Sequence, residues 1–307
     1  MIVARAIAVV GAPSSIGIRP YDDGAVRHLN RAPQVLRDRG LIARLGAADF
    51  GDVAPPSYQD FVRPPDRARN EDQVAAYSRL LAQRVSSGLA HGRFVLVVGG
   101  DCSVVLGCLM AARKKAGDAV GLVYVDAHAD FASPEESRTG SVSSMALALA
   151  TGRGSSTLSR LAGAMPLVGD HHAALLGRRD NATGRHGHAA LAKSAILQMP
   201  SAQLQNDDWL HVAATTLDHV APPDVRGFWI QVDADVLDPM TMAAVDSPEA
   251  GGPTPRELLR VLTPLVQHPR ALGLSLTTYD PALDPDRSCA RRLVNVLEAL
   301  LAPGLLH

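Results

Sequence analysis

The sequence predicts an α/β fold in which a mostly parallel sheet carries helices on both faces. Short apolar runs alternate along the chain with longer segments of helical periodicity, the order expected for parallel strands joined by crossover helices. The run Phe94–Val98 is continuously apolar rather than alternating, as in strands that are covered on both faces. Only 4% of the residues are aromatic, so Ala, Val and Leu must form most of the core, which suits helices packed on such a sheet.

The first elements are expected to be a strand, a loop and a helix. Ile7–Val10 is an apolar strand followed by small residues, and Ala32–Arg39 is a helix that stops at Gly40. We interpret Leu41–Leu45 as a short second strand. Apolar side chains near helical spacing then predict a long amphipathic helix over Glu71–Ala90.

The next two strands each lead into a loop and a helix. Phe94–Val98 is followed by two glycines, which let the backbone pass close to a ligand, and by a helix over Val104–Lys115. Gly121–Val125 is the following strand, and a long polar loop separates it from an apolar helix near Met145–Ala150. A long polar loop after a strand end is typical of the rim of an active site.

The alternation continues in the second half of the chain. We expect a short strand at Ala173–Leu176, a helix at Asp208–Val220 and a strand at Gly227–Val232. Two histidines, His186 and His188, lie in a polar segment between them. We interpret this segment as a solvated loop rather than a metal site, because no strand or helix holds the two imidazoles in place.

The last elements are the most clearly marked. Thr254 and Glu257 form a capping box, in which each side chain satisfies a free backbone amide, at the start of a helix that reaches Gln267. Ala271–Leu276 is the last strand, and Asp286–Leu301 is the closing helix.

Composition excludes several classes of protein. The 30 basic and 31 acidic residues give a net charge of -1, which provides no basic field for nucleic acid. No apolar segment is long enough to span a membrane, and the N-terminal apolar run is too short for a typical signal sequence. The three cysteines, Cys102, Cys108 and Cys289, show no Cys-x-x-Cys spacing and fit a reducing cytosol. We expect a cytoplasmic protein with one domain over residues 1–307, in which Cys108 and Cys289 are small buried groups.

One strand end carries Asp126, His128 and Asp130 at alternating positions after an apolar run. If the run is a strand, these side chains project into one crevice, where oxygen and nitrogen ligands can converge on a divalent cation. Alone, the pattern favours an ordinary strand end with solvated polar residues. A second acidic pair, Asp233 and Asp235, follows a later apolar run, and this favours the metal hypothesis.

Three strand-end motifs therefore coincide: GGDCS at Gly99–Ser103, DAHAD at Asp126–Asp130 and DADVLDP at Asp233–Pro239. In this order they resemble the ureohydrolase family of arginases, agmatinases and formiminoglutamases, over nearly the whole chain. The resemblance implies a three-layer fold around an eight-stranded parallel sheet, usually in a homo-oligomer that acts on a small molecule. It also implies a binuclear manganese centre that hydrolyses guanidino or formimino C–N bonds.

The resemblance also implies a role for each polar side chain of the motifs. Two carboxylates would bridge the cations, whose ligands would be Cys102, Asp126, Asp130 and Asp233 for one metal and Asp126, His128, Asp233 and Asp235 for the other. Cations that share carboxylates can hold a water between them and lower its pKa to about 7, which supplies hydroxide at neutral pH. Asp130 would orient this nucleophile and take its proton. Asp238, before Pro239, is expected to fix a turn.

The chain departs from the family at three positions close to the chemistry. Cys102 stands where the family has a histidine ligand, and a thiolate suits zinc or iron better than manganese; a buried, inert thiol is the alternative. Ser143 stands at the catalytic position of a proton-shuttle histidine, although a hydroxyl cannot carry a proton at neutral pH as an imidazole does. Thr278 replaces the acidic residue that faces the guanidinium, which makes arginine and agmatine weaker candidates.

The resemblance assigns Thr278 and Ser141 to the substrate pocket. Asp280 and Glu249 are the alternatives for the missing acidic residue.

We therefore expect a divergent ureohydrolase-like hydrolase that cleaves a linear amidine or guanidino-type C–N bond with a metal-activated hydroxide. Manganese is the metal that the resemblance implies, and zinc or iron are the alternatives that Cys102 raises. The second hypothesis is a metal-binding homologue with little or no hydrolase activity, because three positions near the chemistry differ together. A nucleotide-binding protein is a weak third, since no Gly-x-Gly-x-x-Gly or P-loop follows the first strand.

Overall fold

The computed structural model describes residues 5–161, 163, 166–180, 187–205 and 208–302. Its centre is a sheet of eight strands in the order β2-β1-β3-β8-β7-β4-β5-β6, and every neighbouring pair is parallel. The strands are β1 (Ile7–Gly11), β2 (Ala48–Asp52), β3 (Phe94–Val98), β4 (Gly121–Val125), β5 (Ala173–Leu176), β6 (Leu197–Met199), β7 (Phe228–Asp233) and β8 (Ala271–Thr277). The predicted α/β fold around a parallel sheet is confirmed.

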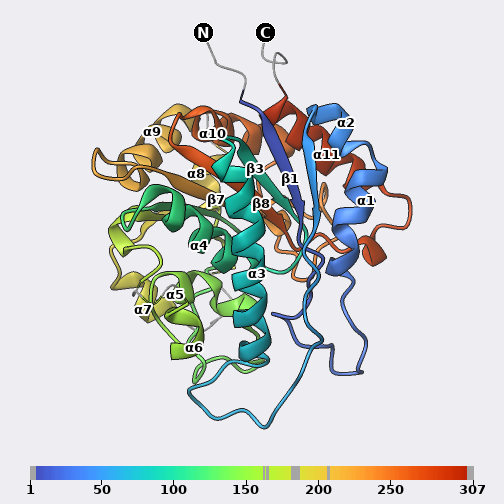
Figure 1. The fold of residues 1–307 in the computed structure, drawn as a ribbon, viewed down its shortest axis with the longest axis vertical. Coiled ribbons are helices and arrows are strands. Elements are labelled where there is room, and N and C mark those ends of the chain that lie inside the picture. Colours follow the sequence, from blue (N-terminus) through green and yellow to red (C-terminus); the bar gives the residue numbers. More distant parts are fainter. Residues whose placement is uncertain (1–4, 162, 164–165, 181–186, 206–207, 303–307) are drawn as a thin grey trace.

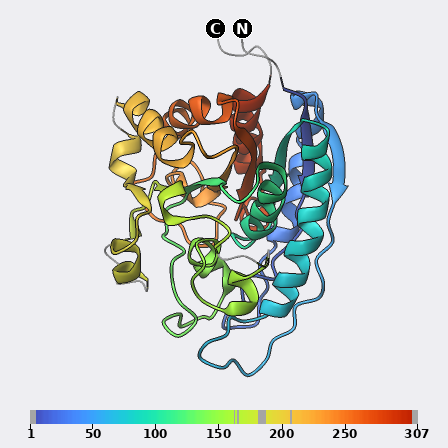
Figure 2. The ribbon, with the colours of Figure 1, turned by 60° about the vertical axis from the view of Figure 1, so that its left-hand side comes forward.

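Two groups of helices cover the two faces of this sheet (Figures 1 and 2). On one face α3 and α4 run side by side, with α5 and α6 beyond them; on the other face lie α1, α2, α9, α10 and α11. The helices are α1 (Ala32–Asp38), α2 (Leu41–Leu45), α3 (Glu71–Ala90), α4 (Val104–Ala116), α5 (Ala146–Ala150), α6 (Ser156–Ser159), α7 (His188–Ala192), α8 (Ser201–Leu204), α9 (Trp209–Val220), α10 (Pro255–Gln267) and α11 (Ser288–Leu301). Short 3₁₀ turns include Leu29–Arg31, Val142–Met145, Asp170–His172, Ala234–Val236 and Pro281–Leu283.

The alternation of side chains along each central strand divides the core in two. In β3, Val95 and Val97 belong to the core under α3 and α4, whereas Leu96 and Val98 belong to the core under the other helices. All five residues of β3 are buried. A strand that is covered on both faces has no polar side to show, which is why its sequence is continuously apolar.

The prediction for Leu41–Leu45 was wrong, because this segment is the helix α2. Leu41 and Leu45, one helical turn apart, are both buried, and Gly40 precedes the helix with a φ of 84°. The strand at this edge is β2, over Ala48–Asp52, which is only partly buried and has no β-branched residue. The other edge strand, β6, was not predicted; it has three residues, of which Met199 alone is buried.

The turn chemistry that the sequence indicates is present. Thr254 and Glu257 form the expected capping box at the start of α10. Asp238 fixes a turn, since its carboxylate accepts hydrogen bonds from the backbone N–H groups of Met240 at 2.9 Å and of Gly251 at 2.9 Å. None of the described helices has the length and the apolar character needed to cross a membrane.

The strands that carry the three motifs lie at the centre of the sheet. The order β3-β8-β7-β4 places the ends of the motif strands β3, β7 and β4 beside one another, with β8 between two of them. Because all these strands are parallel, their carboxyl ends meet at one edge, where parallel α/β sheets bind ligands.

Candidate metal centre

Two glycines carry the chain from β3 to Cys102. Gly99 and Gly100 have φ values of 91° and 86°, a left-handed conformation that favours glycine. A Cβ atom on Gly100 would lie 2.5 Å from Cγ2 of Val104 and 3.1 Å from the carbonyl oxygen of Ala12. The turn therefore needs a residue without a side chain, and it directs the buried Cys102 towards the ends of the neighbouring strands.

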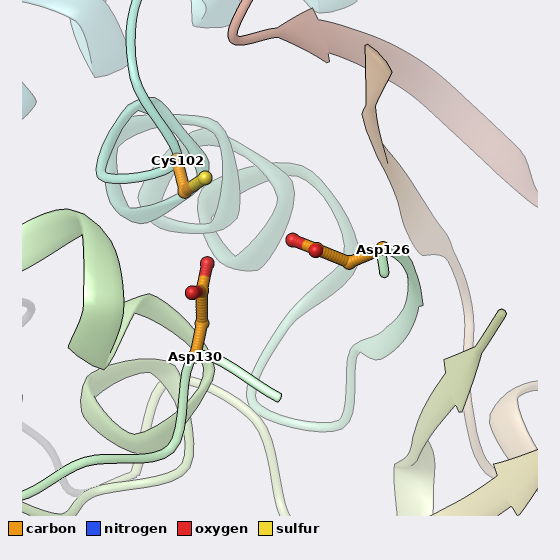
Figure 3. Close-up of side chains that lie close together, drawn as sticks. All are labelled: Cys102, Asp126 and Asp130. Carbon is orange, nitrogen blue, oxygen red and sulfur yellow. The ribbon is translucent and has the colours of Figure 1, made fainter. Parts of the chain in front are cut away.

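The first part of the site, which we call the thiol half, consists of Cys102, Asp126 and Asp130. One ligand atom from each of these residues lies within 4.8 Å of the others, and Figure 3 shows the three side chains pointing towards one another. The Cys102 thiol donates a hydrogen bond to Oδ2 of Asp233 at 3.0 Å. The hydroxyl of Tyr124, in β4, donates to Oδ2 of Asp130 at 2.6 Å, which fixes the direction of this carboxylate.

The second part, the imidazole half, consists of Asp126, His128 and Asp235, whose ligand atoms also lie within 4.8 Å of one another. Nδ1 of His128 is 2.9 Å from Oδ2 of Asp235 and 3.5 Å from Oδ1 of Asp126. Backbone amides hold the carboxylates: the N–H of His128 donates to Asp126 at 2.7 Å, and the N–H of Asp235 donates to Asp233 at 2.8 Å. Asp126 therefore belongs to both halves, and Asp233 contacts both.

The site contains four buried or partly buried carboxyl groups and one imidazole. The proximity of these groups shifts their pKa values. Burial, followed by the neighbouring carboxylates, raises the pKa of Asp126 and of Asp233 well above the usual range. Burial opposes the charged form of His128, but Asp235 and Asp126 together raise its pKa to about 12. Burial and then the acidic neighbours also raise the pKa of the Cys102 thiol. The site thus holds more acidic groups than one imidazolium can neutralise, so without a cation Asp126 and Asp233 keep their protons more tightly than free carboxyl groups do.

Two polar atoms of the site have no hydrogen-bond partner among the residues that the structure describes. Oδ2 of Asp126 and Nε2 of His128 are both buried and unpaired. Oε1 of Glu249 is 3.8 Å from Nε2 of His128, which is too long for a hydrogen bond. A buried acceptor without a partner costs about 1–3 kcal/mol, and more when it is charged. The unpaired Asp126 oxygen and the excess of carboxylates fit divalent cations, which would satisfy both.

The other predicted site residues line the cleft that opens on this centre. The cleft has a volume of about 610 Å³ and is lined by Ser141, Ser143 and Thr278 together with Cys102, His128, Asp130, Asp233 and Asp235. Oγ of Ser141 accepts a hydrogen bond from the backbone N–H of Arg19 at 3.1 Å. Ser143 is held through its own N–H, which donates to the carbonyl of Gly17 at 2.9 Å. The structure therefore brings all nine predicted residues to one place.

Thr278 lines the cleft, but its hydroxyl is hydrogen-bonded to an acidic side chain. Its hydroxyl donates to Oδ1 of Asp233, and its N–H donates to the carbonyl of Gly100 at 2.9 Å. Thr278 and Asp130 have φ values of 63° and 44°, and such conformations of non-glycine residues concentrate at functional sites.

Neither alternative for the missing acidic residue stands in its place. Asp280 is buried and binds backbone amides, those of His28 at 2.9 Å and of Ala282 at 2.8 Å, and it does not line the cleft. Glu249 is near His128, at the imidazole half.

Two functional candidates were missed in the sequence. Tyr124 lies in a buried strand whose other residues are apolar or glycine, and the strand pattern does not indicate that its hydroxyl contacts Asp130. Arg179 follows β5, and its guanidinium donates to the carbonyls of Asp235 at 2.8 Å, Val236 at 3.0 Å and Glu249 at 2.8 Å. It thereby holds the loop that presents Asp235.

His188 belongs to neither group of potential metal ligands in the described part of the chain. His186 lies outside the described residues. His188 is the first residue of α7, so a helix does hold it, and its Nδ1 is 2.8 Å from Nη2 of Arg178. The interpretation of this position as part of a solvated loop was wrong.

Comparison with known proteins agrees with this arrangement. The family model described as "Arginase family" matches residues 5–302. An arginase of Staphylococcus aureus (strain COL) is 27% identical over 313 residues, with 100% of both chains covered, and an arginase of Bacillus subtilis (strain 168) is 27% identical over 307 residues, covering 98% of this chain and 99% of the relative. The solved structure of arginase from Bacillus caldovelox superposes with a TM-score of 0.85 at 25% identity, covering 98% of this chain and 100% of the other. The chain belongs to the arginase family.

Proposed function

We propose that this protein is a metal-dependent hydrolase that cleaves a C–N bond in a linear amidine or guanidino-type compound. The observation that carries the proposal is the unpaired, buried Oδ2 of Asp126 between a thiol, an imidazole and further carboxylates. The solved arginase from Bacillus caldovelox has the same fold. The chain also aligns over 98–100% of its length with the arginases of Staphylococcus aureus and Bacillus subtilis.

In this proposal two cations would be held by Cys102, Asp126, Asp130 and Asp233 on one side and by Asp126, His128, Asp233 and Asp235 on the other. Bound there, they would lower the pKa of a water molecule and supply hydroxide at neutral pH. Manganese is the metal proposed from the family, with zinc or iron as alternatives that the thiol favours.

The remaining chemistry is assigned to side chains of the cleft. Asp130 would accept a proton at its carboxylate, which lines the cleft beside the proposed cations. The Tyr124 hydroxyl would keep this carboxylate oriented. Ser141 and Ser143 offer hydroxyls to a polar substrate, and the cleft of about 610 Å³ has the size of a small-molecule site.

A second candidate function is metal binding with little or no hydrolysis. It is favoured by Ser143, which gives the cleft a hydroxyl where the family would have an imidazole to shuttle a proton. It is also favoured by Thr278, whose hydroxyl is hydrogen-bonded to Asp233. Neither residue supplies the general acid or the carboxylate that a guanidinium substrate would use.

One experiment separates these functions. The full-length protein is stripped with a chelator, reloaded with Mn²⁺, Zn²⁺ or Fe²⁺ and analysed for metal content, then supplied with guanidino, ureido and formimino compounds. Release of urea or ammonia that depends on the metal would support hydrolysis. Metal binding without any product would favour the second candidate, and failure to take up metal would contradict both.

Ser143→His provides a matched test of the missing proton shuttle. If the chemistry is that of a hydrolase, this variant should raise kcat by about 10²-fold, the lower end of the range for general acid–base catalysis, without changing the metal content. Ser144→His, at a neighbouring residue of the same cleft, is the control. Equal effects of the two changes would argue against a specific role for position 143.

A further inference from the structure

We propose that Cys102 binds a cation as a thiolate and thereby makes the two halves of the centre chemically different. The thiol half would then select a thiophilic cation such as Zn²⁺, while the imidazole half keeps nitrogen and oxygen donors only. This inference deepens the proposed function and rests on it only in assuming that the centre holds cations.

The geometry of the thiol half supports direct coordination. Sγ of Cys102, a carboxylate oxygen of Asp126 and one of Asp130 lie within 4.8 Å of one another, and Figure 3 shows them converging on one point from three sides. Ligands on opposite sides of a cation, with Zn–S of about 2.3 Å and Zn–O of about 2.0–2.2 Å, are at most about 4.5 Å apart. A cation can therefore be reached by all three side chains with only small movements.

A second observation, independent of the cysteine, indicates a ligand at this place. Asp126 is 1% exposed, and its Oδ2 has no hydrogen-bond partner. A carboxylate oxygen left in this state is costly unless a cation occupies the space in front of it. The same carboxylate is part of the group that contains Cys102.

The hydrogen bond of the thiol shows what cation binding must change. The S–H group donates to Oδ2 of Asp233 at 3.0 Å. When a metal–sulfur bond forms, the S–H bond breaks and its proton passes to solvent, since only the thiolate is a ligand. The freed Asp233 oxygen then becomes available to the same cation, so that the half gains two donors from one step.

The other cysteines of the chain show what a purely structural thiol looks like here. Cys108 and Cys289 are buried, but neither belongs to a group of potential metal ligands within the described ranges. Cys102 differs from them by its three acidic neighbours, Asp126, Asp130 and Asp233. Thiolate ligands favour zinc, iron or cobalt over the harder manganese ion.

Cobalt is the probe that distinguishes a coordinating thiolate from a nearby thiol that does not bind the cation. The metal-free full-length protein is titrated with Co²⁺ without oxygen, and the absorbance is followed in the near ultraviolet, where thiolate-to-cobalt charge transfer occurs. The wild type and the control Cys289→Ser should show the band, whereas Cys102→Ser and Cys102→His should lack it. Circular dichroism establishes that all four proteins are folded. Two different substitutions are made at position 102, so that the test remains possible if one of the variants does not fold.

Competition between Zn²⁺ and Mn²⁺ gives the second readout. The wild type should prefer Zn²⁺ over Mn²⁺ at the thiol half, and Cys102→His should shift this preference towards Mn²⁺ by about 10-fold or more. Bound cobalt without a charge-transfer band, or the same band in Cys102→Ser, would overturn the inference while leaving the proposed function intact. A band without hydrolysis of any C–N compound would support the inference and count against the proposed function.

Discussion

The two halves of the centre are held in place by different kinds of contact. In the imidazole half, backbone N–H groups hold the carboxylates: that of Ala127 donates to Asp235 at 3.3 Å, and that of His128 donates to the shared Asp126 at 2.7 Å. In the thiol half, side chains hold side chains, through the Tyr124 hydroxyl on Asp130 and the Cys102 thiol on Asp233. A backbone donor remains when the side chain of its own residue is replaced, whereas a side-chain donor can be lost with a single substitution.

This difference agrees with the positions at which the three motifs lead us to expect a departure from the family. Cys102 belongs to the thiol half, and Thr278 bonds to Asp233, which also accepts from that thiol. The two expected departures, at Cys102 and Thr278, thus involve side chains that hydrogen-bond to Asp233.

The largest effect is expected from the residue that both halves share. Asp126→Asn should eliminate tight binding of cations in both halves, because the neutral amide removes the carboxylate that both use. In the metal-free protein the same change should raise the free energy of unfolding by about 1–3 kcal/mol, since it removes one of several crowded, buried carboxyl groups. Elemental analysis and urea denaturation measure the two effects.

Asp238→Asn is the matched control, because that carboxylate fixes a turn outside the two halves. Retention of both cations by Asp126→Asn would contradict the claim that Asp126 is a ligand in both halves.

The imidazole half should be weakened from a distance by a change at Arg179. Arg179→Met removes donors to the carbonyls of Asp235, Val236 and Glu249, which should destabilise the protein by about 2–4 kcal/mol. Affinity for the cation of this half should fall by about 10-fold to 100-fold, while the Co²⁺ charge-transfer band of the thiol half persists. Calorimetric titration of the metal-free protein separates the two halves, and an equal loss in both would contradict their independence.

The sequence predicts the parts of this centre that lie at strand ends. Phe94–Val98 and Gly121–Val125 are buried on both faces, so their apolar pattern is strong and the polar residues that follow are placed well. The edge strands are the opposite case: Ala48–Asp52 is partly exposed, pairs with only one neighbour and shows no such pattern. Parallel strands bring Asp126 and Asp233 together, which explains why carboxylates far apart in the sequence could be predicted to meet.

The residues that orient the site could not be predicted in the same way. Tyr124 is one apolar-looking position among five in its strand, and nothing in the local pattern says that its hydroxyl reaches Asp130. The partners of Arg179 are backbone carbonyls on remote loops, which leave no trace in the identity of the residues that carry them. Contacts of this kind depend on the folded positions of the loops, and periodicity does not encode them.

In the metal-free protein, the free energy of unfolding should depend on pH through Asp130, a residue of the thiol half alone. Burial raises the pKa of Asp130 from 3.8 to about 6, so the folded state binds this proton more tightly than the unfolded state. Its contribution to stability is therefore present below about pH 4 and is lost as the pH rises through about 6. The loss should be roughly 1–3 kcal/mol, and it should be absent from the stability curve of Asp130→Asn, which has no carboxyl group at this position. Urea denaturation between pH 4 and 8 measures it.

The smallest effect is expected for Tyr124→Phe, which removes one hydroxyl and leaves the ring in place. The hydrogen bond to Asp130 at 2.6 Å is lost, and stability should fall by about 1 kcal/mol. The affinity of the thiol half for Zn²⁺ should fall by about 10-fold, because Asp130 is no longer held in the direction of Cys102 and Asp126, while the imidazole half should be unaffected. Tyr77→Phe, whose hydroxyl bonds to the carbonyl of Val53 at 3.0 Å, is a control for the loss of a buried hydroxyl elsewhere. An unchanged Zn²⁺ affinity in Tyr124→Phe would mean that the thiol half is held by its backbone after all, and the distinction between the two halves would disappear.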